Sequence, residues 1–224
     1  MAELIVAFDP PSGRDALSLA ASLPGLRWAK IGPVLYGREG PALVREFTAR
    51  GVRVFLDLKW HDIPSIVAGA VEAAQEHGVA MATVHTLAGP IVLAAAAKAA
   101  GDLALVGVTI LTSHDPGDFE RIVGRGVPDL GFEAERLGRL AVAAGLRGIV
   151  ASGHELVLLR EALGPVPWIV VPGIREPGEA AGDQARTIAA PDAVRLGATH
   201  LVVGRPITQA ADPVGVYQRL MESL

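Results

Sequence analysis

Residues 52–64 read VRVFLDLKWHDIP and are followed at 65–77 by SIVAGAVEAAQEH, so a strand pattern runs into a helix pattern. The apolar run Val54–Leu56 continues into Asp57 and Lys59, which a regular strand, with its period of two, places on one face. Burying charge costs free energy unless the charge is paired or used. The stretch therefore predicts a βα unit whose strand carries chemistry at its carboxyl end.

The distribution of lysine and arginine along the chain also points to the ends of predicted strands. The chain contains seventeen arginines but only three lysines, and two of these, Lys30 and Lys59, end apolar strand-like runs. Arginine cannot give up its proton in a protein, whereas the compact lysine ammonium can. We therefore expect sites at 30 and 59 that need an ammonium group rather than a general cation.

Strand patterns alternate with amphipathic or alanine-rich helical patterns along the whole chain. The predicted strands are 4–8, 27–31, 52–59, 81–85, 103–109, 148–151, 168–171 and 201–204. The predicted helical segments are 15–22, 40–49, 65–77, 90–99, 132–144, 155–163, 191–196 and 213–221. Parallel strands need crossover helices, so eight such units in 224 residues predict an α/β protein, a single (β/α)8 TIM barrel domain over 1–224.

A doubly wound open sheet is the alternative fold. It usually has a glycine-rich dinucleotide turn after its first strand, whereas this chain continues with Asp9-Pro10-Pro11. Residues 112–131 are rich in Gly, Pro and Asp, and they predict a long loop with room for a short helix.

Composition excludes several classes of protein. The formal net charge is −4, and no basic stripe of the kind that binds nucleic acid is visible. The absence of cysteine excludes disulfides, thiolate zinc sites and cysteine nucleophiles. The first residues lack a charged and then apolar signal, and the alanine run at 94–100 is too short to span a bilayer. We expect a cytoplasmic protein without a nucleic-acid or membrane partner.

Polar residues gather where the predicted strands end. In strand order these residues are Asp9, Lys30, Asp57 and Lys59, His85, Thr109 and Thr112, Arg175, and Gly204 with Arg205. In a barrel, the carboxyl ends of the strands meet at the rim where active sites lie. Loops are polar in general, which explains one or two such residues but poorly explains charged groups on six strands.

Four of the candidate residues alternate in sign, namely Lys30, Asp57, Lys59 and Asp62. If they meet in space, each ammonium is held charged by carboxylates and becomes a positioned acid, able to protonate a carbanion or stabilise an anionic transition state. A structural ion-pair lattice is the alternative. Asp57 and Asp62 could also serve magnesium, but Lys59 on the same face argues against it. A Schiff-base lysine would need a lowered pKa, and the aspartates push the other way.

A phosphate site is predicted beside the last two strands. Gly204 lets backbone N–H groups approach an anion, and Arg205 supplies a planar guanidinium. Barrels commonly build phosphate sites from the loops after strands seven and eight. Arg175 and the glycine-rich stretch to Gln184 supply the other wall and a mobile lid. A plain turn with a surface arginine is the alternative.

In order and spacing, these motifs resemble those of the orotidine 5′-phosphate decarboxylase family, whose members complete UMP biosynthesis. The resemblance starts from Asp57-x-Lys59-x-x-Asp62-Ile63-Pro64 and covers nearly the whole chain. The other matching segments are Val6–Asp9, Ala29–Gly32, Leu35–Tyr36, Val84–His85, Leu111–Ser113, Val171–Arg175, Asp183–Arg186 and Val202–Thr208.

The resemblance implies a decarboxylase that converts orotidine 5′-phosphate to UMP as a homodimer, with no cofactor and no metal. It implies three catalytic residues: Lys59 as proton donor to C6 of the pyrimidine, Asp57 against the substrate carboxylate, and Asp62 reaching across the dimer interface. The substrate-binding residues it implies are Asp9 and Lys30 on the ribose hydroxyls, Ile63, Thr112 on the pyrimidine, Gln184, Gly204 and Arg205 on the phosphate, and Arg175 beside the closing loop.

Two departures from the family pattern stand out. After Asp-Ile-Pro the family usually has a small polar residue and then threonine, whereas this chain has Ser65 and Ile66, so one hydroxyl contact expected from the partner subunit is lost. Trp60 is bulkier than the usual aliphatic residue or phenylalanine.

Two other functions compete with this interpretation. The 3-keto-gulonate-phosphate decarboxylases and hexulose-phosphate synthases share Asp-x-Lys-x-x-Asp but use magnesium, place an acidic residue where Lys30 stands, and lack the Ile-Pro that follows Asp62. A catalytically silent barrel that senses a nucleotide is the second. Retention of Lys59, Asp57 and Asp62 together argues against it.

Overall fold

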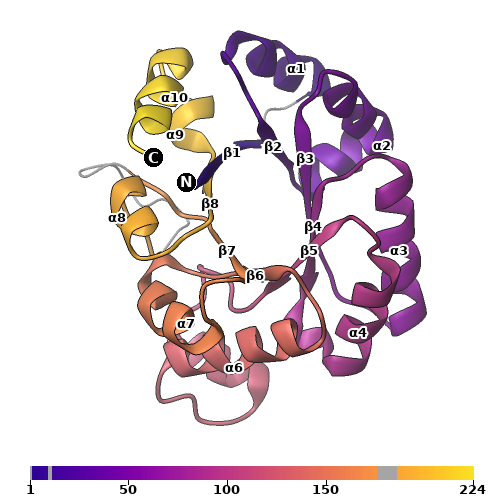
Figure 1. Ribbon diagram of the computed structural model, residues 1–224, viewed down its shortest axis with the longest axis vertical. Helices are drawn as coiled ribbons and strands as arrows, with labels where there is room; N and C mark the ends of the chain where they lie inside the picture. Colours follow the sequence, from indigo (N-terminus) through magenta and orange to yellow (C-terminus); the bar gives the residue numbers. More distant parts are fainter. Residues whose placement is uncertain (1, 10–11, 176–185) are drawn as a thin grey trace.

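The computed structural model describes residues 2–9, 12–175 and 186–224. Eight parallel strands close into a barrel in chain order, and β8 pairs back to β1 (Figure 1). The strands are β1 (Glu3–Phe8), β2 (Trp28–Ile31), β3 (Arg53–Trp60), β4 (Met81–His85), β5 (Ala104–Val108), β6 (Gly148–Val150), β7 (Trp168–Val171) and β8 (His200–Val203). The predicted (β/α)8 barrel is confirmed, and the open-sheet alternative is wrong.

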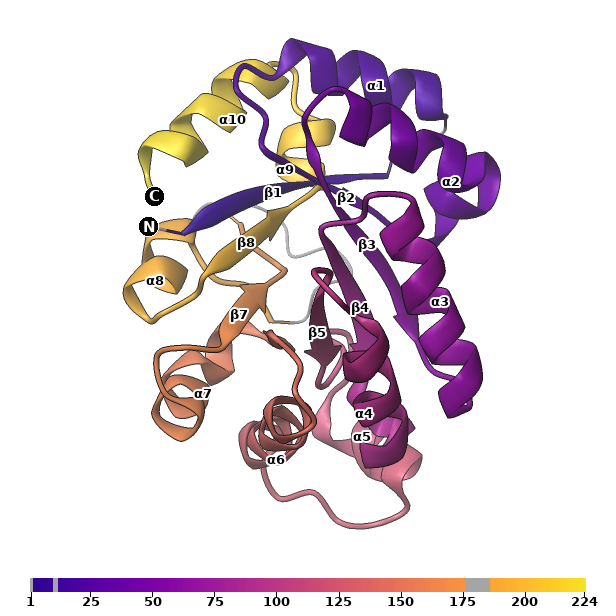
Figure 2. The ribbon, with the colours of Figure 1, turned by 45° about the vertical axis from the view of Figure 1, so that its right-hand side comes forward.

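Helices surround the ring of strands on its outside, as Figures 1 and 2 show from two directions. They are α1 (Gly13–Ser22), α2 (Pro33–Ala49), α3 (Pro64–Glu76), α4 (Pro90–Ala99), α5 (Pro116–Val123), α6 (Leu130–Ala143), α7 (Leu156–Leu163), α8 (Ala190–Arg195), α9 (Arg205–Thr208) and α10 (Pro213–Glu222), with short 3₁₀ turns η1 (Thr86–Ala88) and η2 (Gly153–Glu155). Among the described residues, no helix combines the length and apolarity that crossing a membrane requires.

Two helices differ from the prediction, and a third, α5, is the short helix for which the predicted loop has room. α2 starts at Pro33 because it is two helical segments joined at Gly40, whose φ of 63° is left-handed. Glycine followed by proline interrupts the periodic pattern, so periodicity reveals only the second segment. The loop predicted at 112–131 contains α5, which begins at an Asp115 cap and ends at Gly124. α9 is too short for periodicity to predict.

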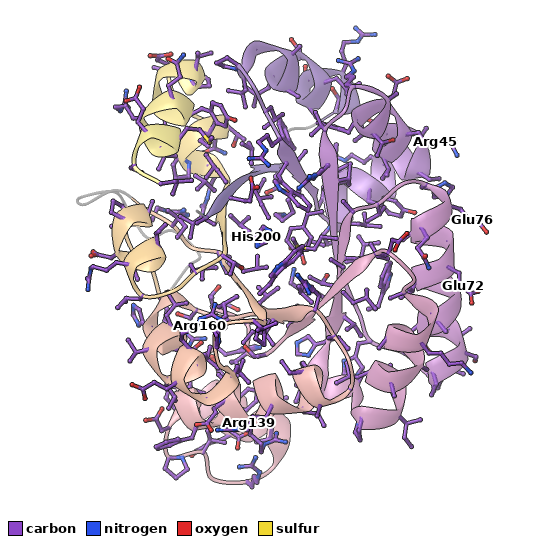
Figure 3. The ribbon with its side chains drawn as sticks, in the orientation of Figure 1. Arg45, Glu72, Glu76, Arg139, Arg160 and His200 are labelled. Atoms are coloured by element: carbon purple, nitrogen blue, oxygen red, sulfur yellow. The ribbon has the colours of Figure 1, made fainter. Side chains whose placement is uncertain are left out.

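The core has two layers, which follow from the period of two along each strand. One set of strand residues, such as Leu4, Val6 and Phe8, packs outward against the helices. The other set fills the inside of the barrel and comprises Ile5, Ala7, Trp28, Phe55, Met81, Val106, Val170 and Val202. Charged side chains such as Arg45, Glu72 and Arg139 point away from the barrel (Figure 3). The filled interior leaves only the strand ends free for a site.

An aromatic cluster fills the amino-terminal end of the barrel. His200 lies within the ring of strands (Figure 3), with its ring centroid 4.5 Å from that of Trp168 and 5.6 Å from that of Trp28. Arg53 and Arg147 cover the two tryptophan rings from outside. Burial, assisted by the charge of Arg53, lowers the pKa of His200 to about 4, so its imidazole is neutral near pH 7. This end of the barrel is a packed base, in which Trp28 is buried and Trp168 partly buried.

Candidate active site

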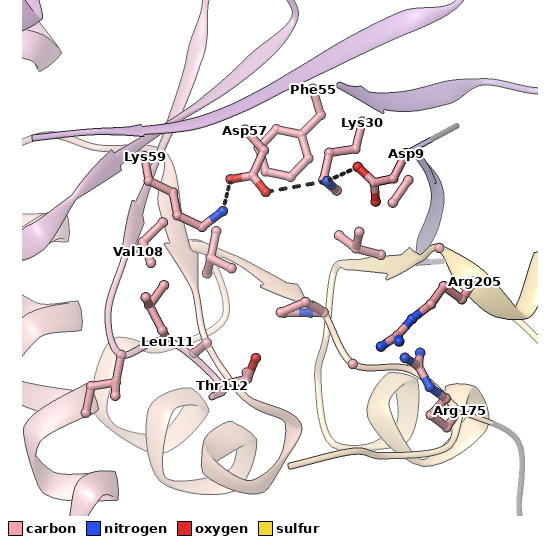
Figure 4. A pocket seen from close by; sticks show the side chains of 18 of the residues that line it. Asp9, Lys30, Phe55, Asp57, Lys59, Val108, Leu111, Thr112, Arg175 and Arg205 are labelled. Atoms are coloured by element: carbon pink, nitrogen blue, oxygen red, sulfur yellow. Dashed lines mark hydrogen bonds and ion pairs between the residues drawn. The ribbon is translucent and has the colours of Figure 1, made fainter. Parts of the chain in front are cut away.

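A cavity of about 450 Å³ opens at the carboxyl end of the barrel strands. As Figure 4 shows, lysine and aspartate side chains stand at one side of the cavity and two arginine side chains at the other. Its lining consists of Ala7, Asp9, Lys30, Phe55, Asp57, Lys59, Val108, Ile110, Leu111, Thr112, Val150, Ala151, Pro172, Gly173, Arg175, Val202, Gly204, Arg205 and Gln209. A volume of this size suits a small organic molecule.

Four charged residues form a line along one side of the cavity. Lys59 Nζ donates to Asp57 Oδ1 at 2.9 Å. Lys30 Nζ lies between two carboxylates, 3.8 Å from Asp57 Oδ2 and 3.9 Å from Asp9 Oδ1 (Figure 4). The side chains of Lys30 and Asp57 are 13% and 14% exposed, so their charges act through a partly desolvated medium. Alternating signs let each charge stabilise its neighbours.

A glycine makes room for this line of charges. A Cβ atom on Gly32 would lie 3.3 Å from Lys30 Nζ and 3.4 Å from Asp9 Oδ1. Those contacts would crowd the two charged groups, so any side chain at 32 would have to displace them. The Ala29–Gly32 motif thus combines a strand-end lysine with the space it needs.

Lys59 reaches the cavity from an irregular backbone. The pairing of β3 with β4 runs Leu56↔Ala82 and then Trp60↔Val84, so the register shifts in between. Lys59 has a φ of 51° and is the one non-glycine residue with positive φ in the part of the chain that the structure describes. The regular alternation expected for Asp57 and Lys59 is therefore wrong in detail, although their side chains do meet. Strained backbone of this kind concentrates at functional sites.

Two arginines occupy the opposite side of the cavity. Arg205 follows β8 and Arg175 follows β7, and in Figure 4 both guanidinium groups reach toward the cavity and toward each other. Thr112 and Gly204 also line the cavity. Arginine guanidinium groups bind phosphate through paired hydrogen bonds. The cavity therefore has a cationic side suited to phosphate and a second side of mixed lysines and aspartates.

Two histidines stack beside the Lys59 strand end. The rings of His61 and His85 have centroids 5.7 Å apart. Burial, followed by the charges of His61, Lys59 and His114, lowers the pKa of His85 to about 4. Its Nδ1 accepts a hydrogen bond from the backbone N–H of Leu87 at 3.3 Å. His85 is thus neutral near pH 7 and bonded to backbone, and neither histidine lines the cavity.

The family model described as "Orotidine 5′-phosphate decarboxylase / HUMPS family" matches residues 2–220. The chain belongs to this family.

Its relatives include an orotidine 5′-phosphate decarboxylase of Alkalilimnicola ehrlichii, 46% identical over 99% of this chain and 95% of the relative. One of Halorhodospira halophila is 48% identical over 94% of this chain and 90% of the relative. The solved structure of orotidine 5′-phosphate decarboxylase from Lactobacillus acidophilus matches with a TM-score of 0.88 at 28% identity, over 100% of this chain and 99% of that one.

Most of the residues singled out from the sequence by family resemblance line one cavity. These are Asp9, Lys30, Asp57, Lys59, Thr112, Arg175, Gly204 and Arg205. Asp62 and Ile63 lie outside the lining and are exposed, and Asp62 Oδ1 accepts the N–H of Ile63 at 2.7 Å. Gln184, and the lid expected around it, lie outside the described residues. Three members of the predicted four-charge set thus meet within one chain, whereas Asp62 stands apart.

Asp57 and Asp62, the pair considered as magnesium ligands, do not come together within one chain. Asp57 Oδ1 accepts from both Lys59 Nζ and the Thr83 hydroxyl, and Asp62 is not part of the cavity wall. Over 2–9, 12–175 and 186–224, histidines and acidic residues form no group of three or more placed to hold a metal ion.

Sequence patterns assign no role to three residues that lie near the cavity. Gln209 lines it from the end of α9, a helix that periodicity does not reveal. Thr83, in the middle of β4, hydrogen-bonds both Asp57 and Lys59. Arg186, known from the sequence only as the last residue of a family motif, pairs with Glu155 and donates to the carbonyl of Leu111 at 3.3 Å. Burial raises the pKa of the Glu155 carboxyl, and the Arg186 charge opposes that rise.

Proposed function

We propose that this protein decarboxylates orotidine 5′-phosphate to UMP in pyrimidine biosynthesis, without a cofactor. The observation that carries the proposal is the two-sided cavity. Arg175 and Arg205 stand on one side, and Lys59, held 2.9 Å from Asp57, stands on the other. Membership of the family and the names of relatives 46% and 48% identical to this chain support the same substrate.

In the proposed reaction, the bond between C6 and the carboxyl group breaks heterolytically. Carbon dioxide leaves, and the electron pair stays on C6. Lys59 then transfers a proton from its ammonium to C6, and the resulting amine regains a proton from solvent. The cationic ammonium of Lys59 beside C6 stabilises the developing negative charge. Asp57 lies against the substrate carboxylate and keeps Lys59 aimed at C6.

The remaining substrate contacts are assigned by resemblance to the family, and all of these residues except Gln184, which lies outside the described residues, line the cavity. Asp9 and Lys30 bind the ribose hydroxyls, and Thr112 binds the pyrimidine. Arg205, the Gly204 backbone and Gln184 bind the phosphate, with Arg175 beside them. Binding energy from the phosphate, which does not react, contributes to transition-state stabilisation at C6 when it holds the substrate in place.

The proposed active form is a homodimer in which Asp62 and Ile63 of one subunit complete the partner's site. Asp62 lies outside the lining of its own cavity, and Ile63 and Ile66 next to it are 61% and 55% exposed. Exposed isoleucines beside an exposed aspartate at the β3 rim are suited to an interface. Ile66 replaces the usual threonine there, so the contact it makes is apolar.

The direct test follows the ultraviolet absorbance of orotidine 5′-phosphate with purified protein and excess chelator. We expect the absorbance to fall with wild type and to stay constant with Lys59→Ala. Thermal unfolding and UMP binding by calorimetry check that the variant is folded with an intact phosphate side. Activity lost on adding chelator would favour the magnesium-dependent branch of the family. Binding of UMP with no turnover by wild type would favour a nucleotide sensor.

A further inference from the structure

Thr83 bonds two of the charged-site residues from a position with no contact of its own to the cavity. It lies two residues after Met81 on β4, so its side chain points into the barrel, and it is fully buried. Its hydroxyl oxygen accepts the backbone N–H of Lys59 at 2.8 Å. Its hydroxyl proton is donated to Asp57 Oδ1 at 3.1 Å.

The bond to the Lys59 N–H takes the place of missing sheet pairing. Between Leu56↔Ala82 and Trp60↔Val84, β3 has three intervening residues where β4 has only Thr83. The Thr83 side chain fills this gap and gives the Lys59 N–H an acceptor there. A left-handed φ at a lysine costs free energy and persists only where surrounding contacts hold it.

The same hydroxyl also fixes the carboxylate. Asp57 Oδ1 accepts from Lys59 Nζ at 2.9 Å and from Thr83, while Oδ2 faces Lys30 Nζ at 3.8 Å. One hydroxyl has one proton to donate, so donation to Asp57 leaves its lone pairs for the Lys59 N–H. Thr83 therefore couples the orientation of Asp57 to the backbone from which the Lys59 ammonium extends.

We propose that Thr83 is a positioning residue, whose hydroxyl sets the backbone of Lys59 and the rotamer of Asp57 so that the ammonium points at the reacting carbon. This inference deepens the proposed decarboxylation and rests on it. Thr83 does not line the cavity, so its effect on substrate acts through those two residues.

The test compares two substitutions of Thr83. Thr83→Val keeps the shape and removes the hydroxyl, and we expect kcat to fall about 10- to 100-fold because a buried N–H and a carboxylate lose a partner. The dissociation constant for UMP should change by less than about threefold, since the phosphate side is untouched. Thr83→Ser keeps the hydroxyl and should restore kcat to within about threefold of wild type.

Thr86→Val is the matched control. Thr86 is also buried, at 1% exposure, and its hydroxyl donates to the backbone carbonyl of Val108 at 2.7 Å. We expect this variant to lose stability while keeping the wild-type kcat. A loss of kcat in Thr86→Val equal to that in Thr83→Val would overturn the proposal, because any buried threonine would then behave alike. So would a Thr83→Val variant with unchanged kcat, or a Thr83→Ser variant as impaired as Thr83→Val.

A spectroscopic measurement decides the inference even if wild type shows no turnover, a result that would refute only the proposed function. The chain has three lysines, so lysine-selective isotope labelling gives at most three side-chain NMR signals. Thr83→Val should shift the Lys59 signal and speed hydrogen exchange at its amide, while the signal of exposed Lys98 stays in place. Unchanged Lys59 signals in that variant would refute a positioning role.

Discussion

Lys59→Arg separates the charge of Lys59 from its transferable proton. The ammonium lies 2.9 Å from Asp57 Oδ1, and the side chain is 35% exposed at the edge of a cavity of about 450 Å³. An arginine there has space to rebuild a charge-assisted hydrogen bond to Asp57. The positive charge is therefore retained, while a guanidinium does not release its proton in a protein.

The expected fall in kcat equals the contribution of proton transfer, because the positive charge is retained. General acid catalysis by a positioned group contributes about 10²- to 10⁴-fold, which corresponds to about 2.7–5.5 kcal/mol of activation free energy. A residue acting through its charge alone would lose little, because the pairing with Asp57 is retained. We therefore expect kcat for orotidine 5′-phosphate to fall at least about 100-fold in Lys59→Arg.

The assay is turnover at saturating orotidine 5′-phosphate, with UMP binding measured by calorimetry to check the cavity. Lys98→Arg is the matched control, because Lys98 is exposed in the last turn of α4 and should tolerate the change without loss of kcat. A Lys59→Arg enzyme that keeps kcat within about tenfold of wild type would refute proton donation by Lys59 and leave only electrostatic stabilisation.

Two further predictions concern the dimer and the base of the barrel. If Asp62 acts in the partner's site, mixing inactive Lys59→Ala and Asp62→Ala subunits yields mixed dimers with one intact site, and activity should return to about a quarter of wild type; no recovery after subunit exchange would contradict a shared site. His200 has a folded pKa of about 4, below the unfolded 6.5, so its neutral form stabilises the fold fully above pH 6.5 and this stabilisation is lost as pH falls toward 4. At pH 5 the loss from this group is about 2 kcal/mol, at 1.36 kcal/mol per pKa unit. Denaturant unfolding at pH 7.5 and 5 should show that much less acid destabilisation in His200→Gln than in wild type, and equal losses would contradict the assignment.

Local patterns predict the barrel and most of the charged site. Strand ends such as Lys30 and Arg205 are recognisable because an apolar run stops at a charged residue. In a parallel barrel, all such ends meet at one rim, so residues at strand ends are candidates for the lining of a common cavity. This logic places eight predicted residues around one cavity. It misses Gln209, because the helix before it is a single turn.

The periodic alternation that identifies strands also leads to an error at the centre of the site. A regular β3 would place Asp57 and Lys59 on one face through strict alternation. The structure brings them together through a register shift and a left-handed Lys59. Periodicity carries no signal for such an irregularity, because it depends on how β4 packs alongside.

The amino-acid sequence alone determines which residue types stand at the strand ends, because short-range hydrophobic periodicity is written into neighbouring positions. Tertiary structure decides how those residues are held. The Thr83 bond to Lys59 joins residues 24 positions apart, and the Arg186 bond to Leu111 joins residues 75 positions apart. Such contacts exist only once the barrel has closed, since closure fixes which strands and loops become neighbours. The chemistry at position 59 therefore depends on local sequence for its ammonium and on the closed barrel for its direction.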